Sequence, residues 1–229
     1  MERTDEHRDL IPDDSDLYNE GGQIAMHLIP TEDEVVALLR DSGALRSGHF
    51  EYSNGLHSDQ YLNVAQVMRH YDTAKQLSVA LSRKLRANPE IRAIIPELSI
   101  VAPATGGLPV AYGVCEALRA RQVYWAEKGE DGGPLRFRPY VEPEPGEKVL
   151  LVDDILRTGQ KLTELRAMIE ARGATVVGLA VVVYQPNPRT PSFGNLPFYY
   201  LAKLEAMYFM DSASIDRSKL PGPVERVWV

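Results

Sequence analysis

Short apolar runs alternate with amphipathic stretches between residues 98 and 184, and this alternation constrains the fold more than any other feature. Helix-period patterns at 107–119 and 162–169 lie between the runs, which cover residues 98–102, 123–125, 149–152 and 175–184. Runs that are apolar on both sides are typical of strands in a sheet whose two faces are covered. We therefore predict an α/β fold with a largely parallel central sheet flanked by helices.

Two helices are predicted ahead of this region. Thr31 and Glu34 have the spacing of a capping box, in which the threonine hydroxyl accepts a backbone N–H of the first turn and the glutamate reaches back. A second helix is predicted over residues 72–86, from an apolar stripe at helical spacing. Residues 47–67 have a loop- and strand-like pattern, and residues 186–197, which hold four prolines, are predicted to be a loop.

The net charge of −7 comes almost entirely from the N-terminus. Residues 1–20 contain eight acids and two bases, a net of −6, which leaves 24 acids and 23 bases, a net of −1, for the rest. We interpret residues 1–29 as an acidic, loosely ordered extension and residues 30–229 as one domain. The acidic total argues against nucleic acid as a partner, but the nearly neutral domain is compatible with small anionic ligands.

Composition argues against three other classes of protein. Hydrophobic residues make up 44% of the chain and charged residues 25%, which excludes wholesale disorder. No run of about 18 apolar residues is present, so we expect no membrane span, and the acidic N-terminus lacks the pattern of a secretory signal. Cys115 is the single cysteine and forms no intrachain disulfide, so we predict a cytoplasmic protein.

The strongest local signal for a site covers residues 149–161. An apolar run is followed by Asp153 and Asp154 and then by a short turn with Gly159 that opens a helix. In open α/β sheets ligands lie at the carboxyl ends of strands, and free amides at a helix N-terminus attract phosphate. Arg157 and Lys161 add positive charge there. The residues alone leave an alternative open, in which the two acids only end a strand and cap the helix.

The same segment resembles the phosphoribosyl-pyrophosphate (PRPP) signature of the type I phosphoribosyltransferases, which is a strand, two acids and a Thr-Gly turn. Three further segments narrow the resemblance to the orotate phosphoribosyltransferases. Residues 48–61 resemble the N-terminal signature of that family, residues 102–107 its pyrophosphate loop, and residues 126–136 its mobile catalytic loop in a short form. The match spans residues 31–210 in the family's order.

The resemblance implies a role for each segment and a small hood built from the N- and C-terminal segments. Catalytic roles are implied for Asp153 and Asp154 under the ribose and for Lys128 beside the leaving group. Binding of the PRPP 5′-phosphate is implied for Leu156, Arg157, Thr158, Gly159, Gln160 and Lys161, and of pyrophosphate for Thr105, Gly106 and Gly107. Base-binding is implied for Ser53, Asn54, Gly55, His57 and Gln185.

The implied partners are PRPP and a nitrogenous base, with orotate first, and a second copy of the chain in a homodimer. Magnesium would be bound mainly through PRPP and water, with no dedicated metal ligands on the protein. Glu130 and Asp131 lie in the catalytic-loop segment, and neither is assigned as an acid or base.

Three departures from the family pattern keep other functions open. Gln160 and Lys161 follow Gly159 where a second glycine and a hydroxyl residue are usual, and Lys128 replaces the frequent arginine. Gln185 stands where orotate enzymes usually present an arginine that contacts orotate, and an amide cannot supply a cation to a carboxylate. The alternatives are a phosphoribosyltransferase for a different base and a non-catalytic regulator that binds PRPP or a nucleotide.

Overall fold

The structure, a computed structural model, describes residues 29–53, 55–129, 132–186, 190–209, 220 and 222–227. The predicted extension, apart from residue 29, lies outside the described residues, as do Asn54, Glu130 and Asp131. No helix in the described ranges has the length and apolar character needed to cross a membrane.

The main sheet has six strands in the order β5-β4-β3-β6-β7-β8. All neighbours are parallel except β5, which runs antiparallel to β4 at one edge, so the predicted parallel sheet is confirmed. The strands are β3 (Leu98–Pro103), β4 (Gln122–Lys128), β5 (Leu135–Phe137), β6 (Lys148–Leu156), β7 (Thr175–Tyr184) and β8 (Phe198–Lys203). The aromatic stretch at 198–200, which the sequence pattern does not place, thus becomes the edge strand next to β7.

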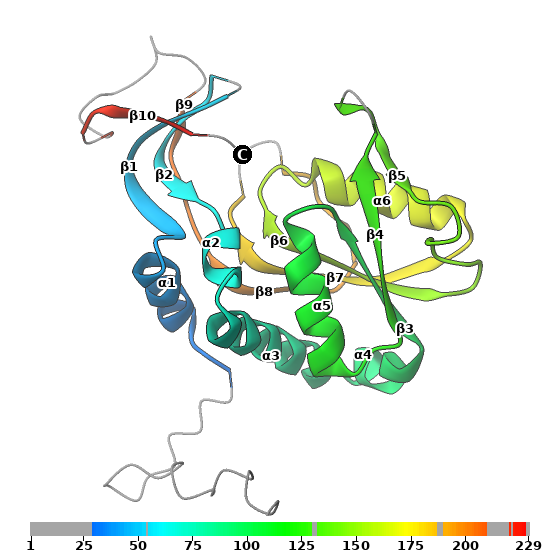
Figure 1. Cartoon of the computed structure of the whole chain (residues 1–229). Helices are drawn as coiled ribbons and strands as arrows, with labels where there is room; N and C mark the ends of the chain where they lie inside the picture. Colours follow the sequence, from blue (N-terminus) through cyan, green and yellow to red (C-terminus); the bar gives the residue numbers. More distant parts are fainter. Residues whose placement is uncertain are drawn as a thin grey trace, which may run out of the picture.

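Helices cover both faces of this sheet (Figure 1). One face packs against α1 (Glu32–Asp41), α3 (Tyr71–Ala87), α4 (Pro89–Ile94) and α5 (Gly107–Leu118), and the other against α6 (Gln160–Ala171). Successive residues of a strand point to opposite faces, so Leu150 belongs to the first core and Leu151 to the second. The capping box is confirmed, because the Glu34 N–H donates to Thr31 Oγ1 (3.2 Å) and the Thr31 N–H to Glu34 Oε2 (2.7 Å).

A second, smaller sheet forms the hood, in the order β10-β1-β2-β9. Its strands are β1 (Leu45–Tyr52), β2 (His57–Leu62), β9 (Tyr208–Phe209) and β10 (Val224–Val227), so both ends of the chain contribute, as expected. Phe50, Tyr52 and Val227 form its own buried cluster. The short helix α2 (Ala65–Met68) follows β2 and leads into α3.

The connections between strands locate the place where a ligand binds in such a fold. From β3 the chain passes through α5 to β4 on one side, whereas from β6 it passes through α6 to β7 on the other side. Parallel pairing of β3 with β6 stops at Val101 opposite Leu151, although both strands continue beyond these residues. The carboxyl ends of β3 and β6 therefore part at the switch point of the sheet, where ligands bind in open α/β folds.

Candidate functional site

Asp153 and Asp154 lie within strand β6 and do not end it. The strand continues to Leu156, with Asp153 paired to Val181 and Ile155 to Val183 of β7. The expectation that the strand ends at the acids is wrong, because the apolar pattern stops at Val152 while the backbone ladder continues. The open alternative is also excluded, since α6 has Gly159 as its N-cap and no side chain caps it.

The predicted pyrophosphate loop lies directly against the two carboxylates. A Cβ atom at Gly106 would be 2.7 Å from Asp154 Oδ2, and one at Gly107 would be 3.0 Å from Asp153 Oδ1. Only glycine permits this approach of the backbone to the acids. Helix α5 begins at Gly107, so free amides of its first turn lie beside the acidic pair. Thr105, Gly106 and Gly107 and the two aspartates are therefore brought together.

The two aspartates differ in their surroundings. Asp153 is only 7% exposed, and its Oδ1 accepts the N–H of Asp154 (2.9 Å), whereas Asp154 is half-buried. Burial raises the pKa of Asp153 well above its ordinary value, and the neighbouring charge of Asp154 adds to this rise. The positive charge of Lys161 acts in the opposite direction.

The predicted phosphate turn is shorter than the segment assigned to it. Leu156 belongs to β6 and is fully buried, and Gln160 and Lys161 are the first residues of α6, both exposed. The turn itself is Arg157 to Gly159. Gly159 has a φ of +70°, and a Cβ atom there would be 2.8 Å from Pro191 Cδ, so the turn requires glycine. The first amides of α6 and the exposed Thr158 hydroxyl remain available to an anion.

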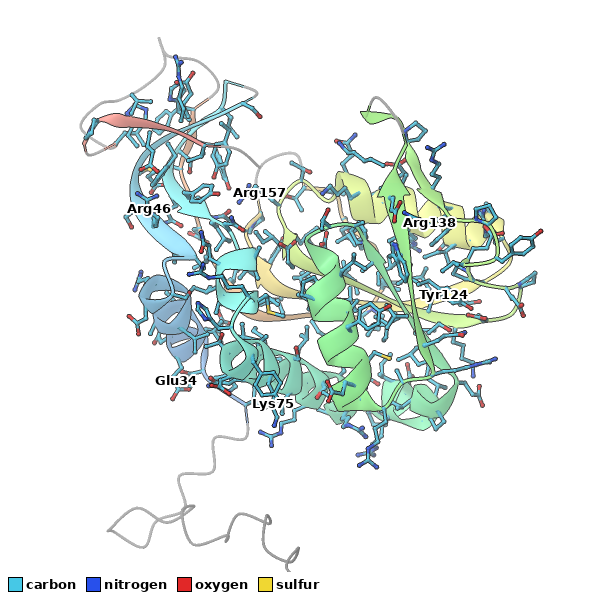
Figure 2. The ribbon with its side chains drawn as sticks, viewed as in Figure 1. Glu34, Arg46, Lys75, Tyr124, Arg138 and Arg157 are labelled. Carbon is cyan, nitrogen blue, oxygen red and sulfur yellow. The ribbon has the colours of Figure 1, made fainter. Side chains whose placement is uncertain are left out.

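The side chain of Arg157 leaves the phosphate turn and reaches the hood. Its Nε donates to Gln185 Oε1 (3.0 Å), and its guanidinium carbon lies 5.5 Å from the centre of the Tyr52 ring. Nη2 also approaches the carbonyl oxygen of Leu62, at 3.5 Å. Figure 2 shows Arg157 between the small sheet and the main sheet. The structure thus places the backbone of Arg157 with the phosphate turn and its side chain with Gln185.

The catalytic-loop segment is a β-hairpin. Strands β4 and β5 pair through Ala126 opposite Phe137 and Lys128 opposite Leu135. Lys128 is exposed at the end of β4, and no hydrogen bond or ion pair within the described ranges holds its ammonium group. Glu127 is tied instead to Arg138 (3.0 Å) and to the indole N–H of Trp125 (3.0 Å), and these bonds lower the pKa of its carboxyl. Lys128 is therefore free to act from the hairpin.

The described residues assigned to the base differ in their surroundings, and no hydrogen bond or ring contact joins one of them to another. Ser53 and Gly55 lie exposed in the β1–β2 turn, whereas His57 is buried with its Nδ1 2.9 Å from His49 Nε2. Gln185 follows β7 and is 1% exposed. Tyr52 is one of the hood residues that contact Arg157, and no sequence pattern singles it out although it directly precedes Ser53.

Tyr208 of β9 is a second residue that the sequence did not single out. Its hydroxyl is buried and has no hydrogen-bond partner among the described residues. Burial raises the pKa of Tyr208 to about 12, and the charge of Arg157 opposes the rise. The surrounding segment, at 205–209, shows no periodic pattern that would have marked it.

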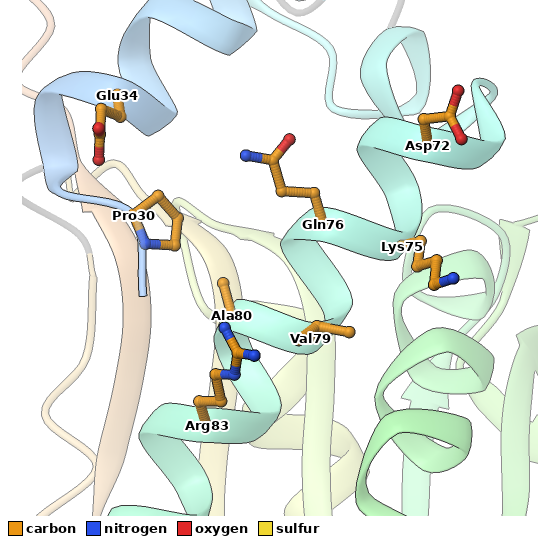
Figure 3. A pocket seen from close by; sticks show the side chains of 8 residues that line it. All are labelled: Pro30, Glu34, Asp72, Lys75, Gln76, Val79, Ala80 and Arg83. Atoms are coloured by element: carbon orange, nitrogen blue, oxygen red, sulfur yellow. The ribbon is translucent and has the colours of Figure 1, made fainter. Parts of the chain in front are cut away.

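Two observations bear on other sites. Within the described ranges, no group of three or more His, Cys, Asp or Glu side chains could hold a metal ion. A surface hollow of about 420 Å³ lies between α1 and α3 and contains none of the predicted site residues (Figure 3). It is lined by Pro30, Glu34, Asp72, Lys75, Gln76, Val79, Ala80 and Arg83.

Known proteins resemble this chain in sequence and in fold. The phosphoribosyl transferase domain family matches residues 71–194. An orotate phosphoribosyltransferase of Pelotomaculum thermopropionicum is 36% identical over 157 residues, which cover 69% of this chain and 77% of the relative. One of Thermus thermophilus is 34% identical over 180 residues, which cover 79% of this chain and 92% of the relative.

Solved structures agree on the fold. The orotate phosphoribosyltransferase of Aeropyrum pernix superposes with a TM-score of 0.59 at 20% identity, and the match covers 74% of this chain and 93% of the other. That of Mycobacterium tuberculosis, in complex with inorganic phosphate, gives a TM-score of 0.53 at 21% identity, covering 76% and 95%. Sequence and fold together establish that the chain belongs to the phosphoribosyltransferase family and, within it, groups with the orotate phosphoribosyltransferases.

Proposed function

We propose that the chain is an orotate phosphoribosyltransferase, which transfers the phosphoribosyl group of PRPP to orotate and gives orotidine 5′-phosphate and pyrophosphate in pyrimidine (UMP) biosynthesis. The observation that carries the proposal is the contact of Asp153 and Asp154 with the Gly106–Gly107 backbone at the switch point of the sheet. This contact joins a pair of carboxylates to a set of free amides, which suits a sugar from which a diphosphate leaves.

The reaction breaks the bond between the anomeric carbon and pyrophosphate and forms a bond from that carbon to a ring nitrogen of orotate, which loses its proton. Pyrophosphate leaves with the electron pair, so the ribose becomes positively charged in the transition state. Asp154, half-buried near the end of β6, would hold the ribose hydroxyls and stabilise this charge, and its closeness to the Gly106 backbone supports this role. Asp153, behind it, fixes the backbone by accepting the Asp154 N–H.

The leaving pyrophosphate would meet the amides at the start of α5 and the exposed ammonium group of Lys128. Lys128 would approach from the β4–β5 hairpin, which would close over the leaving pyrophosphate as the family resemblance implies. Magnesium supplies charge neutralisation for the diphosphate when it arrives with PRPP, and Asp153 and Asp154 are hard oxygen groups that suit its water shell. The 5′-phosphate would bind the exposed Thr158 hydroxyl, the first amides of α6 and Lys161.

The enzyme is proposed to work as a cytoplasmic homodimer, as the family resemblance implies. The single cysteine supports a reducing compartment.

One observation favours a second candidate, a phosphoribosyltransferase for a different base. Gln185 is a buried residue that directly follows β7, and its side chain is an uncharged amide. An amide alone gives little preference for a base with a carboxylate over a base without one. A non-catalytic regulator is less well supported, because the side chain of Gln160 is exposed and does not fill the phosphate turn.

The test is to follow orotate absorbance in the presence of PRPP and magnesium. The proposal expects PRPP-dependent loss of orotate with one pyrophosphate released per orotate consumed. Pyrophosphate release with another base but not with orotate would establish the second candidate. Binding of PRPP without pyrophosphate release for any base would show a regulator.

A further inference from the structure

Arg157 carries a positive charge at the junction of the two sheets, and no ion pair of the described residues neutralises it. Arg46, Arg138 and Arg172 show the contrast, since each of them pairs with a glutamate at 3.0 Å or less. The Arg157 side chain is half-buried, and its contacts are an amide oxygen, a carbonyl oxygen and an aromatic ring. A partly desolvated guanidinium whose hydrogen-bond and ring contacts are all uncharged favours an anionic ligand, while the Asp59 carboxylate acts on Tyr52 and Tyr208 beside it.

Gln185 fixes this guanidinium without cancelling its charge. Its backbone N–H donates to the Leu156 oxygen (2.9 Å), which anchors it to β6, and its Oε1 accepts from Arg157 Nε (3.0 Å). Because the accepted bond uses Nε, the two terminal nitrogens are left for another acceptor, apart from the long 3.5 Å contact to Leu62. Two parallel N–H groups of one guanidinium match the two oxygens of a carboxylate.

Aromatic side chains from the hood complete the surroundings. The Tyr52 ring lies against the guanidinium, and its hydroxyl donates to the Gln60 carbonyl (3.2 Å), so its orientation is fixed. The Tyr208 hydroxyl is buried and has no partner among the described residues. The buried Tyr52 ring therefore supports the guanidinium from one side, and a ligand carboxylate would approach the terminal nitrogens from another.

We propose that Arg157 recognises the carboxylate of the base and that Gln185 is the residue that positions it. This assignment rests on the proposed function and deepens it, because it names the source of the positive charge that Gln185 itself lacks. Arg157 then contributes to both the phosphate-binding and the base-binding parts of the site, because its backbone lies in the phosphate turn and its side chain would contact the base. Lys161, in the first turn of α6, becomes the side-chain cation beside the phosphate turn.

The experiment compares Arg157→Met and Arg157→Lys with the wild type, using orotate and uracil, which have the same ring with and without the carboxylate. Methionine keeps the length and packing of the side chain, and lysine keeps its charge. We expect Arg157→Met to raise the KM for orotate about 10- to 100-fold, the loss typical of charged hydrogen bonds, and to leave the KM for PRPP within about threefold. Arg157→Lys should fall between the wild type and Arg157→Met.

The preference for orotate over uracil is the readout that a merely structural role would not move. Arg40→Ala removes an exposed arginine of α1 and serves as the control, with no change expected. An unchanged preference in Arg157→Met, or a rise in the KM for PRPP in place of orotate, would overturn the assignment and make Arg157 a phosphate ligand. Absence of orotate turnover by the wild type would instead contradict the proposed function, so the two failures are distinct.

Discussion

The Gly106 backbone lies so close to the Asp154 carboxylate that a single added carbon would stand 2.7 Å from Oδ2. This relationship ties the turn that we propose to bind pyrophosphate to the carboxylate that we propose to hold the ribose, so a small substitution in the turn is expected to affect both.

Gly106→Ala is expected to displace the turn or the carboxylate and to lower kcat about 100-fold, because the misplacement affects both groups at once. The free energy of unfolding should fall by about 1–3 kcal/mol from overpacking. Gly43→Ala is the control, since its left-handed backbone (φ +74°) costs about 1–2 kcal/mol but no atom lies within 4 Å of the new carbon. Equal kcat values for Gly106→Ala and the wild type would show that the contact is not needed for turnover.

Asp153→Asn is expected to stabilise the ligand-free protein in a pH-dependent manner. A carboxyl whose pKa is raised by folding contributes stability below its unfolded pKa and loses it as pH rises toward the folded value. The asparagine amide does not ionise and so removes this loss. The gain in the free energy of unfolding should be absent near pH 4 and grow toward neutral pH, to about 1.4 kcal/mol for each unit by which folding raises the pKa. Urea unfolding at both pH values measures it, with the exposed Asp41→Asn as control. A gain independent of pH would refute this cause.

Lys161→Met is expected to raise the KM for PRPP about tenfold and to leave the KM for orotate nearly unchanged, because the lysine is the remaining side-chain cation beside the proposed phosphate turn. Steady-state kinetics with each substrate varied in turn separates the two constants. Lys75→Met, which removes an exposed lysine of α3, is the matched control. A larger effect on orotate than on PRPP would contradict the division of charges between Arg157 and Lys161.

Gln185→Glu is expected to weaken orotate binding although it keeps the hydrogen bond to Arg157. The new carboxylate would pair with the guanidinium and compete with the ligand, so the KM for orotate should rise about tenfold at neutral pH. Gln185→Ala frees the guanidinium but leaves its charge, and a smaller rise is expected. If Gln185→Glu bound orotate as well as the wild type, the charge of Arg157 would have no part in recognition.

Much of the fold could be predicted because buried positions are occupied by apolar residues, whose spacing along the chain follows the period of the helix or strand. The run at 175–184 matches β7 (Thr175–Tyr184) because both faces of that strand are covered, and Thr31 and Glu34 form their capping box from local geometry alone. The sequence pattern predicts too short a strand β6, because Asp153 and Asp154 break the apolar pattern while the strand still pairs with β7.

The candidate site was predictable as a set of segments but not as a set of contacts. The Thr105–Gly107 turn and the two aspartates come together because strand order places β3 beside β6, which no local pattern reports. Arg157 was assigned to phosphate from its position in the turn, and its long side chain reaches Gln185 and Tyr52 only because the hood folds over this end of β6. Tyr208 lies in a strand of two residues, which is too short to produce a recognisable alternation of apolar and polar residues in the sequence.

The most direct test of the central claim is the rate of PRPP-dependent conversion of orotate to orotidine 5′-phosphate by the wild type and by Asp154→Asn, with circular dichroism to show that both are folded. The account predicts turnover by the wild type and a loss of about 100-fold or more in the variant, because the carboxylate that stabilises the cationic ribose is gone. A folded wild type that forms no orotidine 5′-phosphate, or a variant with an unchanged rate, would contradict it.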